Sequence, residues 1–223
     1  MAIYQIQPPE KKKNILNKFS ANKIIIFLNV MLFIIFEALL KLNILKINFI
    51  AIQPANILQG LYLWTFLTSM FMHARFFHLF VNMLSLFFVG SLIEKIIGKK
   101  RYVKFYLIAG ILSGLLFVLS AFIFPADMEA YAVGASGALF GLIGLMMFLT
   151  PDMKVYMMFI PIPIKIKYAA PGMLILLWII SLAGNIPLGN VAHLGGLLAG
   201  LGYGLYLKTK YKRKIQVINK KFS

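Results

Sequence analysis

The chain has 223 residues, of which 61% are hydrophobic, and it carries a formal charge of +17 with no cysteine. Apolar residues make up only about half of an ordinary soluble domain, so this composition indicates one integral membrane domain. Without cysteine the chain cannot form disulfides, use a thiol nucleophile or bind a metal through thiolates.

The placement of the positive charge argues against a nucleic-acid partner. Of the 23 Lys and Arg residues, 20 fall in four groups, and Lys41, Lys46 and Arg75 lie outside them. The four groups cover residues 11–23, 95–104, 154–167 and 208–221. Basic groups that alternate with apolar runs are typical of the cytoplasmic segments of a multispanning membrane protein. We therefore expect the lipid bilayer, and no nucleic acid, as a partner.

Taken in chain order, the apolar runs predict six membrane-spanning helices. They cover residues 24–40, 76–93, 105–124, 136–150, 168–183 and 193–207. A polar tail, residues 1–22, precedes the membrane domain at residues 23–208, and a basic tail, residues 209–223, follows it. The prediction is an all-α membrane protein in the cell membrane, a six-transmembrane-helix bundle with both termini cytoplasmic.

Three further segments connect the predicted spans. Residues 41–75 contain Pro54 and Trp64 and are too interrupted to span, so we expect a half-submerged loop on the outer side. Residues 155–163 are apolar but short and broken by proline, and are expected at the inner interface. Glycine and proline at 184–190 predict a turn between the last two spans.

Ser136, at the start of the fourth predicted span, is expected to lie inside the bilayer. The span ends at Pro151, 15 residues further on, which is about 22 Å of helix. A hydrocarbon core is about 30 Å thick. The serine is therefore predicted several ångströms below the outer membrane face.

Four polar side chains are predicted at nearly the same depth. Counted from the inner ends of their helices, Ser136 and His193 are each 15 residues deep, and His78 and Asn82 are 17 and 13 residues deep. At about 1.5 Å per residue, the four lie within about 6 Å of one another in depth. His78 and Asn82 are four residues apart and so share a helix face.

These residue types suit nucleophilic catalysis. A serine becomes a nucleophile beside a base, which is usually histidine. A tetrahedral oxyanion needs hydrogen-bond donors, and the Asn82 side chain, a histidine N–H and the unpaired Ser136 backbone N–H can supply them. We therefore expect Ser136 as a candidate nucleophile, a histidine at this depth as its base, and the other donors as a candidate oxyanion site.

Supporting residues surround this set. Gly137 and Gly141 follow the serine, and Gly196 and Gly200 follow the histidine, at a spacing that lets membrane helices approach closely. Phe140, four residues after the serine, shares its helix face and is in a position to pack against the His193 ring.

Each feature also has a structural explanation. A serine in a glycine-rich membrane helix is usually packing material. A metal site would lack a carboxylate or thiolate set, and His73 and His78, five residues apart, do not share a helix face. A transporter would carry charges along its pathway, but Glu37 is the only acidic residue inside a predicted span. The shared depth of the four polar groups favours catalysis over these explanations.

Four motifs stand in order along the chain. They are WTFLTSMFMH at residues 64–73, HLFVN at 78–82, GASG at 134–137 and AHLGGLLAG at 192–200. Together they resemble the rhomboid family of intramembrane serine proteases, over nearly the whole membrane domain.

The resemblance implies a Ser136–His193 dyad with no acidic third member, no cofactor and no metal. It also implies the oxyanion site of His78, Asn82 and the Ser136 amide, supporting roles for Gly134 and Gly137, and a structural role for His73. The implied activity is a serine endopeptidase that cleaves single-span membrane proteins near the outer membrane face.

Two positions depart from the family pattern. Thr65 stands where an arginine often follows the loop tryptophan, and Phe140 stands where a tyrosine often packs under the catalytic histidine. Non-proteolytic relatives of the family lack the serine or the histidine. Because both are present here, the enzyme is the favoured prediction.

Overall fold

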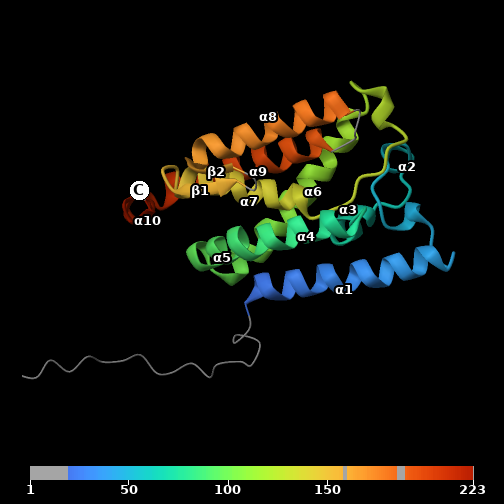
Figure 1. Cartoon of the computed structure of the whole chain (residues 1–223), viewed down its shortest axis with the longest axis horizontal. Helices are drawn as coiled ribbons and strands as arrows, with labels where there is room; N and C mark the ends of the chain where they lie inside the picture. The colour runs from blue at the N-terminus through green and yellow to red at the C-terminus, as the bar shows by residue number, and fades with distance from the viewer. Residues whose placement is uncertain (1–19, 158–159, 185–188, 223) are drawn as a thin grey trace, which may run out of the picture.

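The computed structural model describes residues 20–157, 160–184 and 189–222, and its long helices lie side by side along the longest axis (Figure 1). The longest are α1 (Ala21–Lys41), α6 (Lys99–Ser120), α8 (Ile166–Gly184) and α9 (Asn190–Lys210). One continuous helix is made of α4 (Phe76–Ser85), the π-helical turn η4 (Leu86–Gly90) and α5 (Ser91–Ile97). The shorter α7 (Ser136–Leu149) lies among them.

Four of the described helices are long and apolar enough to cross a membrane, namely α1, α4 to α5, α6 and α8. α7 is apolar, but its 14 residues extend only about 21 Å. α9 is as long as α1, but Asn190, His193 and several glycines lower its hydropathy. The fold is thus a mostly helical membrane protein, and the six-span count and the cytoplasmic termini stay predictions.

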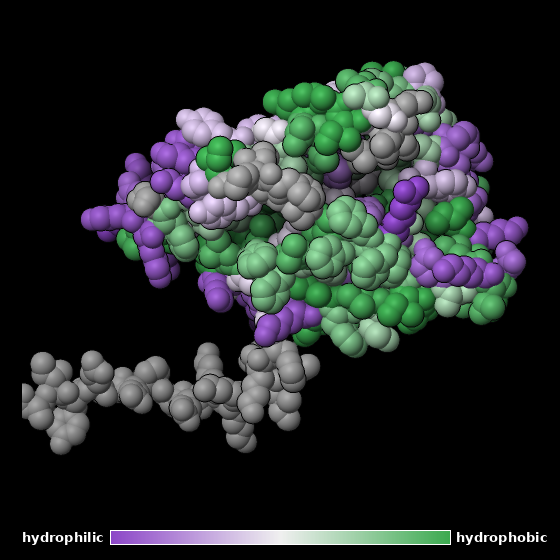
Figure 2. Space-filling view, in the orientation of Figure 1, coloured by the Kyte–Doolittle hydropathy of each residue, from purple (hydrophilic) through white to green (hydrophobic). Residues whose placement is uncertain are grey.

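The surface of the molecule is banded. Hydrophilic residues gather mainly at the two ends of the long axis, and hydrophobic residues cover the middle (Figure 2). The described basic groups lie at the end that holds the start of α1, the turn between α5 and α6, and α10 (Figure 1). This banding matches a bundle whose long axis crosses a bilayer.

One predicted span is shifted from the observed helix. The third was expected at residues 105–124, but α6 begins at Lys99, directly after Gly98 with φ +83°, and ends at Ser120. The basic first turn is helical because charged residues at a membrane interface remain in water while their backbone continues the helix. Hydropathy marks the apolar part of a helix and not its backbone ends.

The first turn of α1 is held by a carboxylate from α5. Glu94 accepts hydrogen bonds from the Ser20 hydroxyl at 2.5 Å and from the backbone N–H groups of Ala21 at 2.8 Å and Asn22 at 2.9 Å. These backbone groups are among the donors that every helix start leaves unpaired. A single side chain of α5 therefore joins that helix to the start of α1.

Asn22 continues this junction into the core. Its side chain is fully buried and donates to the Leu86 carbonyl at 2.7 Å and to the Ser91 hydroxyl at 3.0 Å. It accepts from the Tyr102 hydroxyl at 2.6 Å. Leu86 begins the π-helical turn, where the regular ladder is interrupted, so Asn22 bonds a carbonyl at the irregular part of the helix.

The segment expected as a half-submerged loop folds into short helices. They are η2 (Ile47–Phe49), α2 (Pro54–Leu58), α3 (Thr65–Thr68) and η3 (Ser69–Phe71). Ile52 and Ala132 form a two-way backbone bridge with N–O distances of 3.1 and 2.8 Å. The Gly134 N–H donates to the Ser69 carbonyl at 2.8 Å. The loop, together with η5 (Pro125–Asp127), thus fixes the backbone that leads into α7.

The loop is held together without the arginine that the family pattern often has. The Trp64 indole donates to the Phe49 carbonyl at 3.0 Å, and the Thr68 hydroxyl donates to the Ile50 carbonyl at 2.9 Å. Thr65 is buried, and its hydroxyl has no hydrogen-bond partner among the described residues. Backbone carbonyls of the loop therefore carry the network.

The described residues of the segment 155–163, which was expected at the inner interface, belong to two paired strands at the basic end of the molecule. β1 (Lys154–Met157) pairs antiparallel with β2 (Ile160–Lys165). Asp152 accepts from Lys167 at 2.9 Å and from Lys165 at 3.0 Å, and these bonds hold the pKa of Asp152 below its usual range. The hairpin is an addition to the predicted all-helical fold.

The predicted basic tail is helical. α10 (Lys212–Phe222) follows α9 after Tyr211 and buries Ile215 against the bundle. The Arg101 guanidinium donates to the Tyr211 hydroxyl at 3.1 Å and so ties this end to the start of α6. The predicted tail at 1–22 and turn at 184–190 lie mostly or partly outside the described residues.

Candidate active site

Ser136 and His193 come together in the middle of the bundle. The Ser136 Oγ lies 2.8 Å from the His193 Nε2. His193 is buried, with 8% of its surface exposed, and Ser136 is partly exposed. The two side chains are 57 residues apart in sequence, and the contact is short enough for a proton to pass between a hydroxyl and an imidazole.

The backbone before Ser136 explains its position. Gly134 has φ +122°, and Ala135 is the N-terminal flanking residue of α7. A Cβ on Gly134 would lie 2.7 Å from the His78 Cε1, so both the backbone conformation and the close approach require glycine. Ser136 therefore begins α7 with its backbone N–H in the first turn, where N–H groups have no helical partner.

The imidazole of His193 is held by ring stacking. The Phe140 ring lies 4.7 Å from it, centroid to centroid, at an interplanar angle of 22°. The buried His193 Nδ1 has no hydrogen-bond partner among the described residues. The stacking is thus the observed contact that orients the face of the ring.

His78 and Asn82 lie on the neighbouring α4. The His78 ring sits against Gly134, and the Asn82 amide donates to the His78 carbonyl at 2.8 Å. Asn82 is buried at 3% exposure, and its Oδ1 has no partner among the described residues. The structure therefore brings His78 beside the loop before Ser136, with Asn82 one helical turn below it.

His73 contacts the same loop one residue further on, at Ala135. Its ring is fully buried, its Nε2 accepts from the Ala135 backbone N–H at 3.4 Å, and its centroid lies 5.1 Å from that of His78. Burial, together with neighbouring His78, lowers the pKa of His73 from 6.5 to about 3. A neutral ring that accepts a backbone hydrogen bond fits a positioning role.

The glycines set the distance between α7 and α9. A Cβ on Gly196 would overlap the Gly137 carbonyl oxygen, and a Cβ on Gly200 would overlap the Gly141 carbonyl oxygen. The two helices therefore touch backbone to backbone. This close approach lets the short serine side chain reach the imidazole.

Ser113 on α6 is a site residue that sequence reasoning missed. Its hydroxyl donates to the Ala192 carbonyl at 2.7 Å, and the side chain fills the space beside Gly137. It thus connects the residue before His193 to the residue after Ser136. In the sequence, a serine on an apolar helix carries no signal of such a role.

The described residues contain no group of three or more His, Cys, Asp or Glu that could hold a metal ion. The site is made of a hydroxyl, imidazoles, an amide and backbone N–H groups. What this arrangement can do is activate a serine hydroxyl and stabilise an oxyanion.

Comparisons with known proteins agree with one another. Residues 61–210 match the model of the Rhomboid domain. RHOMBOID-like protein 5 of Arabidopsis thaliana is 35% identical over 153 residues, which are 66% of this chain and 46% of that protein. RHOMBOID-like protein 1 of the same plant is 37% identical over 153 residues, 66% and 36% of the two chains.

A bacterial relative is similar over the same region. Rhomboid protease GluP of Bacillus subtilis is 30% identical over 158 residues, 69% of this chain and 28% of that protein. Other relatives bear names with "Inactive" or "mitochondrial". The chain spans about half or less of the length of these relatives. The match covers α4 to α9 and all four polar residues of the site, and the chain belongs to the rhomboid family.

Proposed function

We propose that the chain is an intramembrane serine protease with a Ser136–His193 dyad. The observation that carries this proposal is the 2.8 Å contact between the Ser136 Oγ and the His193 Nε2. His193 takes the proton as Ser136 attacks a backbone carbonyl, and then gives it to the leaving amine. Water enters in a second round of the same steps and releases the acyl group.

The oxyanion of each tetrahedral intermediate is held by His78, Asn82 and the Ser136 backbone N–H. The position of His78 against Gly134 supports this assignment. The remaining N–H of the Asn82 amide, beyond the one bonded to the His78 carbonyl, is the donor available to an anion. Buried donors of this kind stabilise developing charge more than donors in water do.

The substrate follows from the depth of Ser136. With α7 and α9 as additional spans, the bundle has six, both termini are cytoplasmic, and the serine lies below the outer face of the cell membrane. The scissile bond then lies near the outer end of a single-span membrane protein. A helix in lipid satisfies its own backbone groups, so the stretch to be cut must first unwind.

Residues that weaken a helix lower this cost, by about 1 kcal/mol for Gly and about 3 for Pro relative to Ala. We expect Gly or Pro just after the scissile bond. We expect a small residue just before it, because the closely packed, glycine-rich helices near Ser136 leave little room for a large side chain. Replacing the helix breakers of a model substrate by Leu should suppress cleavage. Equal cleavage of an unbroken poly-Leu span with Phe before the cut would refute this substrate class.

Labelling with a fluorophosphonate tests the dyad directly. The purified full-length chain should be labelled, and Ser136→Ala and His193→Ala should each lose labelling and cleavage while remaining folded. The double mutant should be no worse than either single one, because the two residues act as a unit. Ser85→Ala, on the same bundle away from the dyad, is the matched control; substantial turnover by Ser136→Ala would sink the proposal.

A further inference from the structure

A groove of about 540 Å³ lies between the end of α1 and the start of α4, at the end of the molecule opposite the basic groups. Its lining includes Phe33, Ile34, Glu37, Lys41, Arg75 and Phe76. It therefore combines three charged side chains with apolar walls. No part of the proposed proteolytic mechanism uses it.

The charges in this groove are the ones that stand apart in the sequence. Lys41 and Arg75 are two of the three cations outside the four basic groups, and Glu37 is the acidic residue inside α1. The Lys41 Nζ lies 3.6 Å from a Glu37 carboxylate oxygen. Within the described part of the chain, Arg75 makes no ion pair. Arg75 is at least 34 positions from Glu37 and Lys41 in the sequence, and the three charges nevertheless lie at one surface site.

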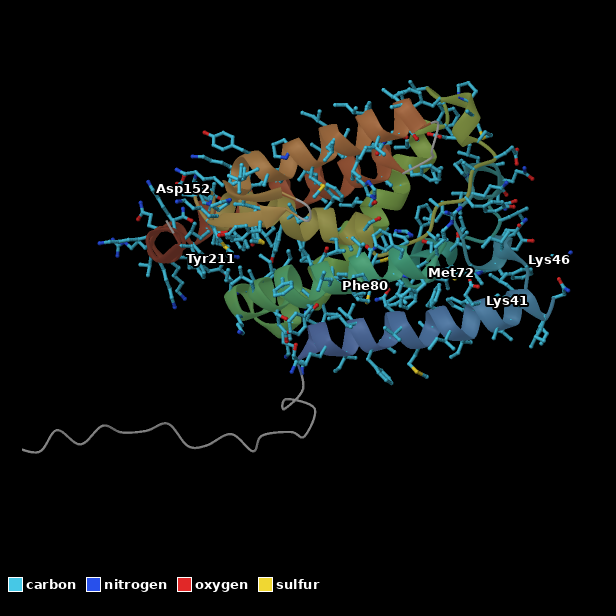
Figure 3. All side chains as sticks on the ribbon, viewed as in Figure 1. Lys41, Lys46, Met72, Phe80, Asp152 and Tyr211 are labelled. Atoms are coloured by element: carbon cyan, nitrogen blue, oxygen red, sulfur yellow. The ribbon has the colours of Figure 1, made fainter. Side chains whose placement is uncertain are left out.

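The depth of the groove matches the headgroup layer. Along α1, Glu37 and Lys41 are 16 and 20 residues after Ala21, or about 24 and 30 Å. The hydrocarbon core is about 30 Å thick. If α1 begins at one boundary of this core, Glu37 and Lys41 therefore lie near the opposite boundary. Figure 3 places Lys41 and Lys46 at the end of the molecule far from Asp152 and Tyr211.

The walls of the groove can accept acyl chains. Ile34, one helical turn before Glu37, is 58% exposed, and Phe76, directly after Arg75, is 72% exposed. Exposed apolar side chains below a charged rim are the surface that a lipid with its headgroup in the groove would cover. A water-soluble ligand would leave this apolar surface uncovered.

We propose that the groove binds the headgroup of a phospholipid that carries a primary ammonium, as phosphatidylethanolamine does. Arg75, with its planar fork of donors, binds the phosphate, and Lys41 adds a second cation. Glu37 accepts hydrogen bonds from the ammonium. The carboxylate would repel a purely anionic headgroup, and a trimethylammonium group has no N–H to donate to it.

Native mass spectrometry of the full-length chain in detergent tests this assignment. Phosphatidylethanolamine, phosphatidylcholine and phosphatidylglycerol with identical acyl chains are titrated separately, and the dissociation constant of the first bound lipid is measured. Wild type should bind phosphatidylethanolamine most tightly. Arg75→Gln should weaken binding of all three lipids about two- to fivefold, the range of an exposed ion pair, and Arg75→Lys should weaken it less.

Glu37→Gln should remove the preference for phosphatidylethanolamine over phosphatidylcholine while leaving phosphate binding in place. Lys46→Gln is the matched control, because Lys46 is an exposed cation near the same end of the molecule that does not line the groove. Equal binding of all three lipids to wild type would overturn the proposal. So would an effect of Lys46→Gln as large as that of Arg75→Gln, or retention of the preference in Glu37→Gln, which would leave a polypeptide as the better candidate occupant.

Discussion

The hydrogen bonding of the Asn82 side chain leads to a prediction that enzyme kinetics can measure. One of its N–H groups is bonded to the His78 carbonyl, and its Oδ1 is buried without a partner among the described residues. Such an amide is costly to bury, and an anion that accepts its second N–H would use it. The unpaired Oδ1 costs stability, and the oxyanion role proposed for Asn82 uses its second N–H.

Asn82→Ala should lower kcat by about 10²–10³, the usual effect of losing one oxyanion donor, with little change in KM. The reason is that the donor acts on the charge that develops in the transition state. Steady-state kinetics with a model transmembrane substrate measure both constants. A change confined to KM would assign Asn82 to substrate binding instead.

His73 makes the stability of the protein depend on pH. The folded state keeps this ring neutral down to about pH 3, whereas the unfolded chain takes up a proton below about pH 6.5. Stability is therefore fully present above pH 6.5 and falls by about 1.4 kcal/mol per pH unit as pH drops toward the folded pKa.

His73→Gln should flatten this dependence, because glutamine does not titrate there and its carbonyl can still accept from the Ala135 N–H. Thermal unfolding of both proteins in detergent between about pH 7 and pH 5 measures the difference. Parallel curves for the two proteins would show that His73 takes up its proton as readily when folded as when unfolded.

At the residue scale, the sequence singled out the four polar side chains, and it predicted the packing of Phe140 on His193 and the close glycines, but it did not predict the hydroxyl groups that bond to nearby carbonyls. Depth along a helix could be counted because polar groups inside a bilayer are few. The roles of Ser113 and Thr68 could not be predicted, because their partners are carbonyls of Ala192 and Ile50. Every residue has a backbone carbonyl, so the sequence does not indicate which carbonyl will accept a given hydrogen bond.

Among the elements, α8 is the least firmly packed of the long helices near the site. Its buried residues, Ile166, Ala169 and Ala170, all lie near its N-terminal end. Toward its C-terminal end, Leu177 packs beside the cluster of Phe140 and Leu197, while Trp178 is 37% exposed. The C-terminal half of α8 can therefore separate from the bundle at lower cost than its N-terminal half.

Leu177→Ala should raise the rate of cleavage of a membrane-embedded substrate, because it weakens the contact that must open if substrate enters beside α8. Ile179→Ala, at an exposed position, should change the rate less. Uniformly reduced activity with the protein still folded would argue for another entry route.

Element boundaries and types were predictable only in part. Apolar runs located every long helix, but the start of α6 and the hairpin of β1 and β2 carried no clear signal. Pro161 and Pro163 discourage an inner strand but are tolerated at the edges of a two-stranded ribbon. The Leu86 carbonyl at the start of the π-helical turn accepts from Asn22, 64 residues away, and no local pattern can encode such a partner.

For the whole molecule, the distribution of charge predicts orientation. The described basic groups lie at one end of the long axis, and the loop with Asp127 and Glu129 lies at the other (Figure 1). From this distribution the positive-inside rule predicts that both termini are cytoplasmic. The four apolar helices alone do not determine the number of spans, because α7 and α9 must also cross the membrane for the count to reach six.

Fusion reporters at residues 5 and 220 should both read cytoplasmic, and one at residue 128 should read exterior. Protease protection in sealed membranes gives an independent measurement. Termini on opposite sides would mean an odd number of spans, and the equal depth of Ser136 and His193 would then have to arise in another way.

The bond network of Glu94 has a consequence for the order of events during synthesis. The N–H groups of Ala21 and Asn22 find their acceptor in a residue made more than 70 positions later. At about 5–20 residues per second, a ribosome needs roughly 4 to 14 s to reach it. During that interval the N–H groups of Ala21 and Asn22 lack the Glu94 carboxylate, and only the local Ser20 cap, which accepts from the Lys23 N–H, holds the first turn of α1. The newborn helix is thus free to slide in depth until α5 arrives and fixes its register.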